Sequence, residues 1–235
     1  MNSFKAYLAL CRVSNLPTVW TNVLAACLLA GGGCEAASFM LLALALSCFY
    51  LAGMCLNDLC DAGHDRQHRP GRPIPSGRVS LNGARLLTLT LFTAGFLLLA
   101  AAPKPSGLAA AVLLLLAIVA YDFHHKGNPF SVLLMALCRL LVFVVAALAL
   151  TGQLAPPVLV AGGIQFVYVV LISLVARHEN ARPAPFAFPV IPAMLAGISL
   201  VDGIVIASLV SFPWLLAGIA GALLTWAGQR FVRGD

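Results

Sequence analysis

The sequence is poor in charged residues. They make up 9% of the 235 amino acids, whereas soluble domains carry about 25%. A soluble fold of this length would need more polar side chains to cover its surface, so the composition excludes one. Hydrophobic residues reach 61% and the mean hydropathy is +0.98, which also excludes a disordered or collagen-like chain. The composition therefore predicts a protein that crosses a membrane several times.

Paired cysteines and a removable leader are also missing. The chain has seven cysteines, an odd number, and none of them forms a CxxC pair. This excludes a small secreted domain held by disulfides, and we interpret the cysteines as small buried apolar residues. The N-terminus has no basic segment followed by an apolar core and a small-residue cleavage site. We therefore expect the first apolar run to stay in the mature protein as a membrane span.

Long apolar runs fill most of the chain. A bilayer core requires about 20 apolar residues per helix, and the polar breaks divide the sequence into eight candidate spans. These cover residues 16–32, 38–56, 81–102, 107–121, 130–151, 157–176, 188–209 and 213–232. The runs are continuous and do not alternate, which favours helices over strands of a barrel. The expected fold class is all-α, a polytopic transmembrane helical bundle that forms one domain over residues 1–235.

Most of the basic residues lie on one side of this arrangement. With the N-terminus inside, the loops at 57–80, 122–129 and 177–187 and the C-terminal tail share one face, and they carry nearly all of the Lys and Arg. The positive-inside rule then predicts a bacterial-type inner (plasma) membrane protein with both termini and this face in the cytoplasm. The net charge of +6 is thereby explained without a nucleic-acid partner. Most acidic side chains share this face, so we expect the chemistry there.

The most informative segment is NDLCDAGHDRQHRPGRPIPSG, residues 57–77. On a helix, Asp58, Asp61 and Asp65 fall within an arc of about 60°, with Asn57 at its edge. Carboxylates so close repel one another unless they share a cation, and hard oxygen ligands suit Mg²⁺. Because Mg²⁺ usually keeps positions open for phosphate oxygens, the pattern predicts a magnesium site that binds a diphosphate.

Two arginines follow the aspartates. Arg69 and Arg72 each precede a proline that stiffens the chain, and their guanidinium groups suit phosphate oxygens. A plainer interpretation is a solvated helix end in which acids and bases neutralise one another, and we favour it for Arg66 and Arg78. Three acids on one helix face are less usual, so we favour a functional role for the aspartates and Arg72.

Three other interpretations compete with a magnesium site that binds a diphosphate. His64 and His68 are four residues apart and could bind zinc, but the HExxH order is absent. The Arg-Pro and Pro-Ser-Gly elements are typical of membrane lipid phosphatases, which need a histidine where this chain has Arg78. A nonenzymatic lipid-binding or transport protein is the third alternative. Transporters usually carry charges near the middle of the membrane, whereas nearly all charges here lie at one face.

The run N-D-x-x-D-x-x-x-D followed by R-P-x-R-P-I-P-S-G resembles the first aspartate-rich motif of the UbiA family of intramembrane prenyltransferases. Residues 12–22, the pair Tyr121-Asp122 and Lys126 support the resemblance. It implies a helical bundle, usually of nine spans where we count about eight, with a central cavity open to lipid that holds a polyprenyl chain. It also implies a Mg²⁺-dependent transferase that moves an isoprenyl group from a polyprenyl diphosphate donor to an aromatic or small polar acceptor.

The residues themselves and the resemblance together predict roles for individual positions. Asn57, Asp61, Asp65 and Glu179 are the expected metal ligands, and the catalytic carboxylates are Asp58, Asp61, Asp65 and Asp122. The expected substrate-binding residues are Arg12, Asn15, Arg69, Arg72, Tyr121, Lys126, Arg139 and Arg177.

The sequence departs from the family pattern in the stretch ARHENAR, residues 176–182. Family members usually carry two aspartates after the sixth span, and here Glu179 alone is acidic. This departure resembles an outlying branch, similar to UbiA-like proteins encoded with Ebo-type gene clusters.

Two charges also fall inside predicted spans. We expect Arg139 to face the cavity and to pair with Asp122 or a diphosphate oxygen, with a structural ion pair as the alternative. We expect Asp202 to mark a helix break or a structural hydrogen bond.

Overall fold

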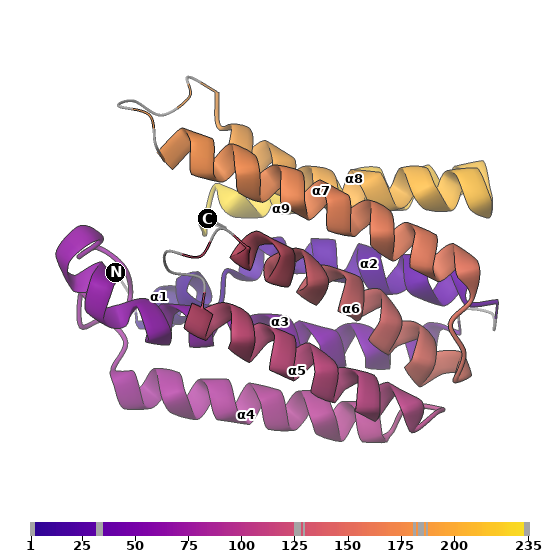
Figure 1. Ribbon diagram of the computed structural model, residues 1–235, viewed down its shortest axis with the longest axis horizontal. Coiled ribbons are helices and arrows are strands. Elements are labelled where there is room, and N and C mark those ends of the chain that lie inside the picture. The colour runs from indigo at the N-terminus through magenta and orange to yellow at the C-terminus, as the bar shows by residue number, and fades with distance from the viewer. Residues whose placement is uncertain are drawn as a thin grey trace.

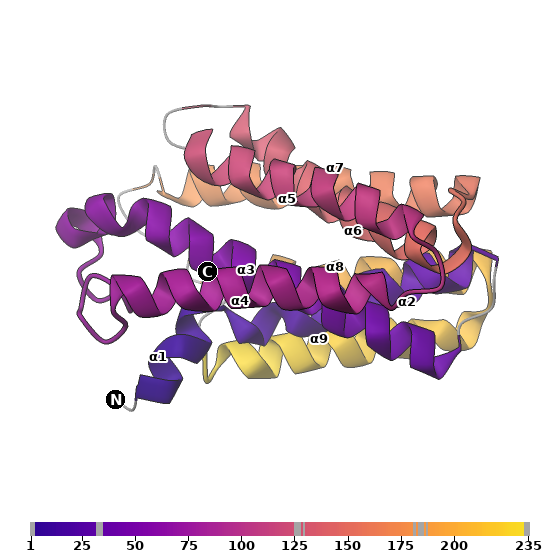
Figure 2. The same ribbon diagram turned by 90° about the horizontal axis from the view of Figure 1, so that it is seen from below.

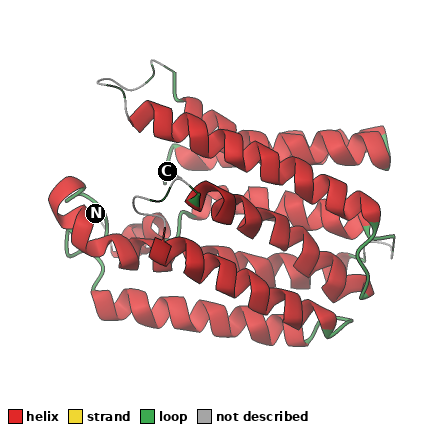
Figure 3. Ribbon diagram, in the orientation of Figure 1, coloured by secondary structure: helices red, strands yellow, loops and turns green. Residues whose placement is uncertain are grey.

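The computed structural model describes residues 3–31, 35–124, 128, 130–180, 182, 186 and 188–232. Helices and loops make up this described part, without strands (Figure 3). The helices are α1 (Ser3–Leu10), α2 (Leu16–Leu29), α3 (Ala36–His68), α4 (Leu81–Ala100), α5 (Ser106–His124), α6 (Ser131–Thr151), α7 (Pro156–Asn180), α8 (Val190–Leu209) and α9 (Leu215–Gln229), with short 3-10 turns η1 (Val13–Asn15) and η2 (Phe212–Trp214). The all-α prediction is confirmed.

The long helices run side by side along one axis, as two views at right angles show (Figures 1 and 2). Each predicted span corresponds to one of the helices α2 to α9. Helices α3 to α8 are long and apolar enough to cross a membrane, and residues 13–29 form a shorter apolar helix. The second predicted span covers only part of its helix, because α3 continues to His68 as a helix of 33 residues. At 1.5 Å per residue this helix is about 50 Å long, more than a bilayer core requires.

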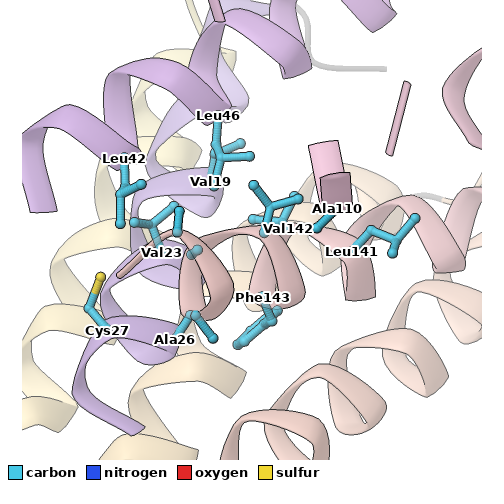
Figure 4. Packing of buried hydrophobic residues seen from close by; sticks show 14 of the residues in the cluster. Val19, Val23, Ala26, Cys27, Leu42, Leu46, Ala110, Leu141, Val142 and Phe143 are labelled. Atoms are coloured by element: carbon cyan, nitrogen blue, oxygen red, sulfur yellow. The ribbon is translucent and has the colours of Figure 1, made fainter. Parts of the chain in front are cut away.

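Helix α2 lies at the centre of the bundle, where it packs against α3, α6, α8 and α9. Val19 and Val23 of α2 meet Leu46 of α3 and Val142 of α6 in one buried apolar cluster (Figure 4). Helices that follow one another in the chain form hairpins around this core, such as α3 with α4 and α5 with α6. The core therefore joins the first and second halves of the chain through α2.

Glycine allows two of the helices to approach very closely. A Cβ atom added to Gly203 of α8 would lie 2.6 Å from the Cα atom of Gly218 in α9. Side chains cannot occupy that space, so only glycine at both positions permits this crossing of α8 and α9. The glycines at this contact hold α8 and α9 together as the last hairpin.

Large apolar side chains cover the outside of the bundle. Leu86 and Leu97 on α4 and Leu216 and Leu223 on α9 are all more than 60% exposed. Water would penalise such a surface, whereas lipid tails are as apolar as leucine. Together with the long apolar helices, this surface is that of an integral membrane protein. The side that faces the cytoplasm and the kind of membrane stay predictions.

Candidate active site

The three aspartates of α3 surround the side chain of Arg72. The Nη1 atom of Arg72 lies 2.8 Å from Oδ2 of Asp65 and 3.3 Å from Oδ1 of Asp58. It is 4.0 Å from Oδ2 of Asp61. The structure thus brings the three acids to one helix face, where their oxygens converge on a single cationic nitrogen. Asp58 and Asp65 are 5% and 3% exposed, so these charges need their mutual compensation.

The turn between α3 and α4 places Arg72 against the aspartates. The hydroxyl of Ser76 donates to the Arg72 carbonyl oxygen at 2.7 Å, and the backbone N–H of Val79 donates to the Pro73 carbonyl at 3.1 Å. Ile74 and Val79 are buried in a small apolar cluster with residues of α1 and α3. The apolar anchors and the proline-rich backbone together hold the arginine over the helix end.

Arg12 approaches the same acids from the junction of α1 and η1. Its Nη2 atom lies 3.5 Å from Oδ1 of Asp58, and its Nη1 atom lies 3.5 Å from the sulfur of Met54. Arg12 has a φ of 47°, in the left-handed region that costs a non-glycine residue about 1 kcal/mol or more. Such strain concentrates at functional sites, and here it accompanies a guanidinium held beside a buried carboxylate.

Asn57 connects the aspartate helix to α5. Its Nδ2 atom donates to Oδ1 of Asp122 at 3.0 Å, and both side chains are buried, at 8% and 4% exposed. Sequence spacing had placed Asn57 at the edge of the acidic face. The structure shows that this edge faces the end of α5, so Asp122 lies next to the acid cluster.

A mostly apolar pocket lies beside this cluster between α3, α5, α6, α7 and α8. Its apolar wall includes Leu46, Phe49, Leu114, Ile118, Val142 and Val169. Asp122 and Tyr121 line it near the end of α5, and Tyr50 and Arg139 contribute further polar groups. Asp122 therefore belongs both to the pocket wall and, through Asn57, to the aspartate helix. The predicted sideways opening to lipid stays a prediction.

The other predicted site residues have different surroundings. Asn15 accepts a hydrogen bond from Nε2 of Gln229 at 3.1 Å, which ties η1 to the end of α9. Arg69 directly follows α3 and is exposed. Lys126 lies outside the described residues. These roles in substrate binding stay predictions.

The end of α7 makes contacts within the protein. Nη2 of Arg177 donates to the Asn128 carbonyl oxygen at 3.1 Å and to the Ser131 hydroxyl at 3.0 Å. Oε1 of Glu179 accepts from the backbone N–H of Phe186 at 3.2 Å. By contrast, Arg12 and Arg72 form ion pairs with the α3 aspartates. Glu179 as a metal ligand stays a prediction.

The structure places Arg139 in the pocket wall, with partners that sequence reasoning missed. Its Nη1 atom donates to Oδ1 of Asn22 at 2.8 Å and to the Thr18 hydroxyl at 3.3 Å, whereas we expected it to pair with Asp122 or a diphosphate oxygen. Asn22 in turn donates to Asp202. The signal available in the sequence was the spacing of polar residues along 15–22, which places them on one face of a helix.

The acid cluster of α3 offers the oxygen ligands that a hard metal ion requires. Among the residues that the structure describes, no three His, Cys, Asp or Glu side chains form a ready-made metal site. The three carboxylates nevertheless converge on one cation, Arg72, and hard oxygens of this kind fit Mg²⁺. His64 and His68 stack with ring centres 4.1 Å apart and are exposed, an arrangement that offers no zinc tetrahedron.

Taken together, the fold and the site define an integral membrane bundle whose charged groups gather at one end of an apolar pocket. The model of the UbiA prenyltransferase family matches residues 18–235. The chain therefore belongs to the UbiA prenyltransferase family.

Similar proteins agree with this assignment. The digeranylgeranylglyceryl phosphate synthase of Methanopyrus kandleri is 34% identical over 125 residues, which cover 53% of this chain and 45% of that protein. The match thus spans less than half of that relative. A structure of a digeranylgeranylglyceryl phosphate synthase has a TM-score of 0.67 at 20% identity, covering 98% of this chain and 88% of the other. A UbiA homologue from Archaeoglobus fulgidus bound to DMAPP and Mg²⁺ has a TM-score of 0.64 at 14% identity, covering 94% and 98%. These two structures support the fold.

Proposed function

We propose that the protein is a membrane prenyltransferase that moves an isoprenyl group from a polyprenyl diphosphate to a small polar lipid. The observation that carries the proposal is the convergence of three α3 carboxylates on Arg72 beside a mostly apolar pocket. The names of relatives favour an acceptor of the glyceryl phosphate class. Nothing in the comparisons supports the aromatic acceptor that we expected as one alternative.

The donor has two chemically different parts, and the site offers a matching region for each. Its apolar chain fits the pocket, where each buried CH₂ group contributes about 0.8 kcal/mol to binding. Its diphosphate fits the charged end, where Arg12 and Arg72 carry guanidinium groups. Arg69 and Lys126 are proposed to complete the diphosphate site. We expect such a division to bind the donor with its reactive carbon at the border between the two regions.

Asn57, Asp61 and Asp65 are proposed to hold Mg²⁺, with Asp58 next to them and Glu179 as a further ligand. Bound Mg²⁺ would neutralise negative charge on the diphosphate oxygens. The presence of Mg²⁺ with DMAPP in the Archaeoglobus fulgidus homologue supports this proposal. Burial of Asp58 and Asp65 strengthens their attraction for cations because little water screens the charges.

The residues of this chain then have separate parts in the reaction. The C–O bond of the donor breaks and its electron pair leaves with the diphosphate, whose charge Arg12 and Arg72 stabilise. The allylic cation is surrounded by the apolar pocket wall, which excludes water, and by the π faces of Tyr50 and Tyr121. The acceptor oxygen forms the new bond to carbon. Asp122, in the pocket wall, is proposed to take the proton that the acceptor loses.

A nonenzymatic lipid-binding or transport protein is the second candidate. The hydrogen bonds of Arg177 to Asn128 and of Glu179 to Phe186 favour it, because residues used in this way are less available to a diphosphate. A lipid phosphatase is less compatible, since Arg78 occupies the position of the required histidine and bonds to Ser76 and Gly71.

Purified protein in lipid nanodiscs, incubated with radiolabelled prenyl diphosphates of several lengths and a panel of acceptors, tests the proposal. We expect a prenylated product that depends on Mg²⁺ and disappears in Asp61→Ala. Donor binding that depends neither on Mg²⁺ nor on Asp61 would contradict the proposal that the protein is an enzyme. Binding that depends on Mg²⁺ without turnover of any acceptor would favour the nonenzymatic candidate, and phosphate release from a lipid monophosphate would favour the hydrolase.

A further inference from the structure

A polar stripe runs along one face of α2 through an otherwise apolar bundle. Asn15, Thr18 and Asn22 follow one another at spacings of three and four residues, which places them on the same face. All three are buried, and Thr18 and Asn22 are 0% exposed. Polar side chains inside a membrane bundle are costly unless they are bonded, and such groups often mark a functional site.

The carboxylate of Asp202 lies at the inner end of this stripe. Its Oδ2 atom accepts from the Thr21 hydroxyl and from Nδ2 of Asn22, each at 2.7 Å. Its Oδ1 atom accepts from Nε2 of Gln165 at 2.7 Å. These bonds join α8 to α2 and α7, and Asp202 is 1% exposed. Such a well-bonded buried acid can balance a positive charge nearby.

Arg139 provides that positive charge. It lies eight residues into α6, about 12 Å along the helix, and its Nη1 atom bonds to Asn22 and Thr18. The Asn22 amide therefore presents its oxygen to Arg139 and its nitrogen to Asp202. Because the carboxylate accepts only from the nitrogen, Asp202 fixes the orientation of the amide and, through it, the position of the guanidinium.

Arg139 lines the pocket and has hydrogen-bond donors that its bonds to α2 do not use. Arginine has five N–H donors, and the two bonds to α2 use only Nη1. Within the part of the chain that the structure describes, Nη2 and Nε have no hydrogen-bond partner, while Arg139 lines the pocket. A guanidinium with unused donors in the wall of an apolar pocket suits an oxyanion, which accepts charge-assisted hydrogen bonds.

This place differs from the proposed diphosphate site. Asp122 lies two residues from the end of α5 and Arg139 eight residues after the start of α6. The two helices are consecutive and pack as a hairpin, so Arg139 lies about 9 Å deeper in the bundle than Asp122. An anion held by Arg139 is therefore a second group, carried by a molecule that also fits an apolar pocket.

We propose that Arg139 binds an oxyanion of the acceptor inside the pocket and that Asp202, through Asn22, is a positioning residue. This inference rests on the proposed function, because it assigns the anionic group of an acceptor lipid of the glyceryl phosphate class. By this contact, Arg139 selects acceptor lipids that carry a phosphate over the same lipids without the phosphate.

Equilibrium binding to the protein in nanodiscs tests the inference. The probes are a radiolabelled prenylglyceryl phosphate, the same lipid without its phosphate, and a prenyl diphosphate with Mg²⁺. We expect the wild type to bind the phosphate lipid at least about tenfold more tightly than the alcohol, the size of one charge-assisted hydrogen bond. Arg139→Gln removes this preference and leaves alcohol and donor binding within about twofold. Arg85→Gln, an exposed arginine on α4, is the matched control and changes neither.

Asp202→Asn tests the positioning role. We expect a smaller loss of phosphate preference with alcohol binding unchanged, because the guanidinium loses its orientation and not its charge. A merely structural role would weaken binding of both lipids equally. Arg139→Lys retains the positive charge and should restore part of the preference for the phosphate lipid. This variant also shows whether Arg139→Gln acts through the lost charge, even if Arg139→Gln folds poorly.

The outcomes separate the two proposals. A wild type that shows no phosphate preference overturns the inference, as does an Arg139→Gln variant that loses donor binding instead. Phosphate-lipid binding that depends on Arg139, in a protein that transfers no prenyl group, supports the inference and contradicts the proposed function.

Discussion

The ends of α3 and α7 carry similar residue types but use them differently. Both lie at the same end of the bundle (Figure 1), and both combine acids with arginines. At the end of α3, Asp58 and Asp65 are buried around Arg72. At the end of α7, Arg177 is exposed and bonds to Asn128 and Ser131.

Burial explains why this difference matters. Exposed charges are screened by water and contribute little, whereas buried charges interact strongly and leave a large penalty when one partner is removed. The α3 end therefore concentrates electrostatic free energy in a small volume, as a diphosphate site requires. The contacts at the α7 end hold helices and loops together. Four substitutions test this contrast, beginning with the largest expected effect.

Arg72→Ala should have the largest effect. It leaves the buried Asp58 and Asp65 without their main cationic partner and removes a proposed diphosphate ligand. We expect donor binding to weaken by about 100-fold and the free energy of unfolding to fall by about 3 kcal/mol. Donor binding and denaturant unfolding measure the two effects. If both stayed at wild-type values, the cluster would be an ordinary solvated helix end.

Asp61→Asn should act on magnesium more than on stability. Asp61 is 4.0 Å from Arg72, farther than Asp58 or Asp65, so the fold loses little. We expect Mg²⁺-dependent donor binding to fall by about tenfold or more, as measured by titration of Mg²⁺ at fixed donor. When Mg²⁺ is chelated, Asp61→Asn and the wild type should bind the donor equally. Glu35→Gln, an exposed acid before the other end of α3, serves as the control.

Asn57→Ala should disturb the connection between the acid cluster and the pocket. It removes the 3.0 Å hydrogen bond to the buried Asp122, which costs about 1–3 kcal/mol when an acceptor loses its partner. We expect a lower melting temperature together with reduced prenyl transfer. Asn57→Asp places a second acid beside Asp122, so it should lower the melting temperature and prenyl transfer further than Asn57→Ala does. An Asn57→Asp variant that is more active than Asn57→Ala would contradict this account.

Glu179→Gln should have the smallest effect. Its side-chain oxygen can still accept from the Phe186 N–H, so stability should change by no more than about 0.5 kcal/mol. We expect Mg²⁺-dependent donor binding to fall by less than about threefold, because the α3 acids supply most of the charge. A loss as large as that of Asp61→Asn would show that the α7 end is a full partner of the α3 end and would remove the contrast.

The predicted features are those that depend on neighbouring residues in the chain. Apolar runs located the spans, and the 3.6-residue period placed the three aspartates on one face. The length of α3 was underestimated, since polar residues 57–68 ended the apolar run without ending the helix. Hydrophobic patterns mark where a helix enters lipid, and they do not mark where its hydrogen bonds stop.

Contacts between distant residues were not accessible in the same way. Asn57 and Asp122 are 65 positions apart, Arg139 and Asn22 are 117 apart, and Asn22 and Asp202 are 180 apart. From the sequence we expected Asp202 to mark a helix break or a structural hydrogen bond, and it makes hydrogen bonds within a continuous α8. Its link to Arg139 through Asn22 depends on α2 packing against both α6 and α8, which no local pattern encodes.

By itself, the sequence determined the class of this protein, the places where its helices cross the membrane and the helix face that carries its aspartates. These follow from hydrophobicity and helical periodicity, which act over a few residues. The tertiary structure decided which cation the aspartates surround, which helix Asn57 joins and what Arg139 presents to the pocket. Those outcomes require side chains from separate helices to meet, and only the packing of the whole bundle sets their distances.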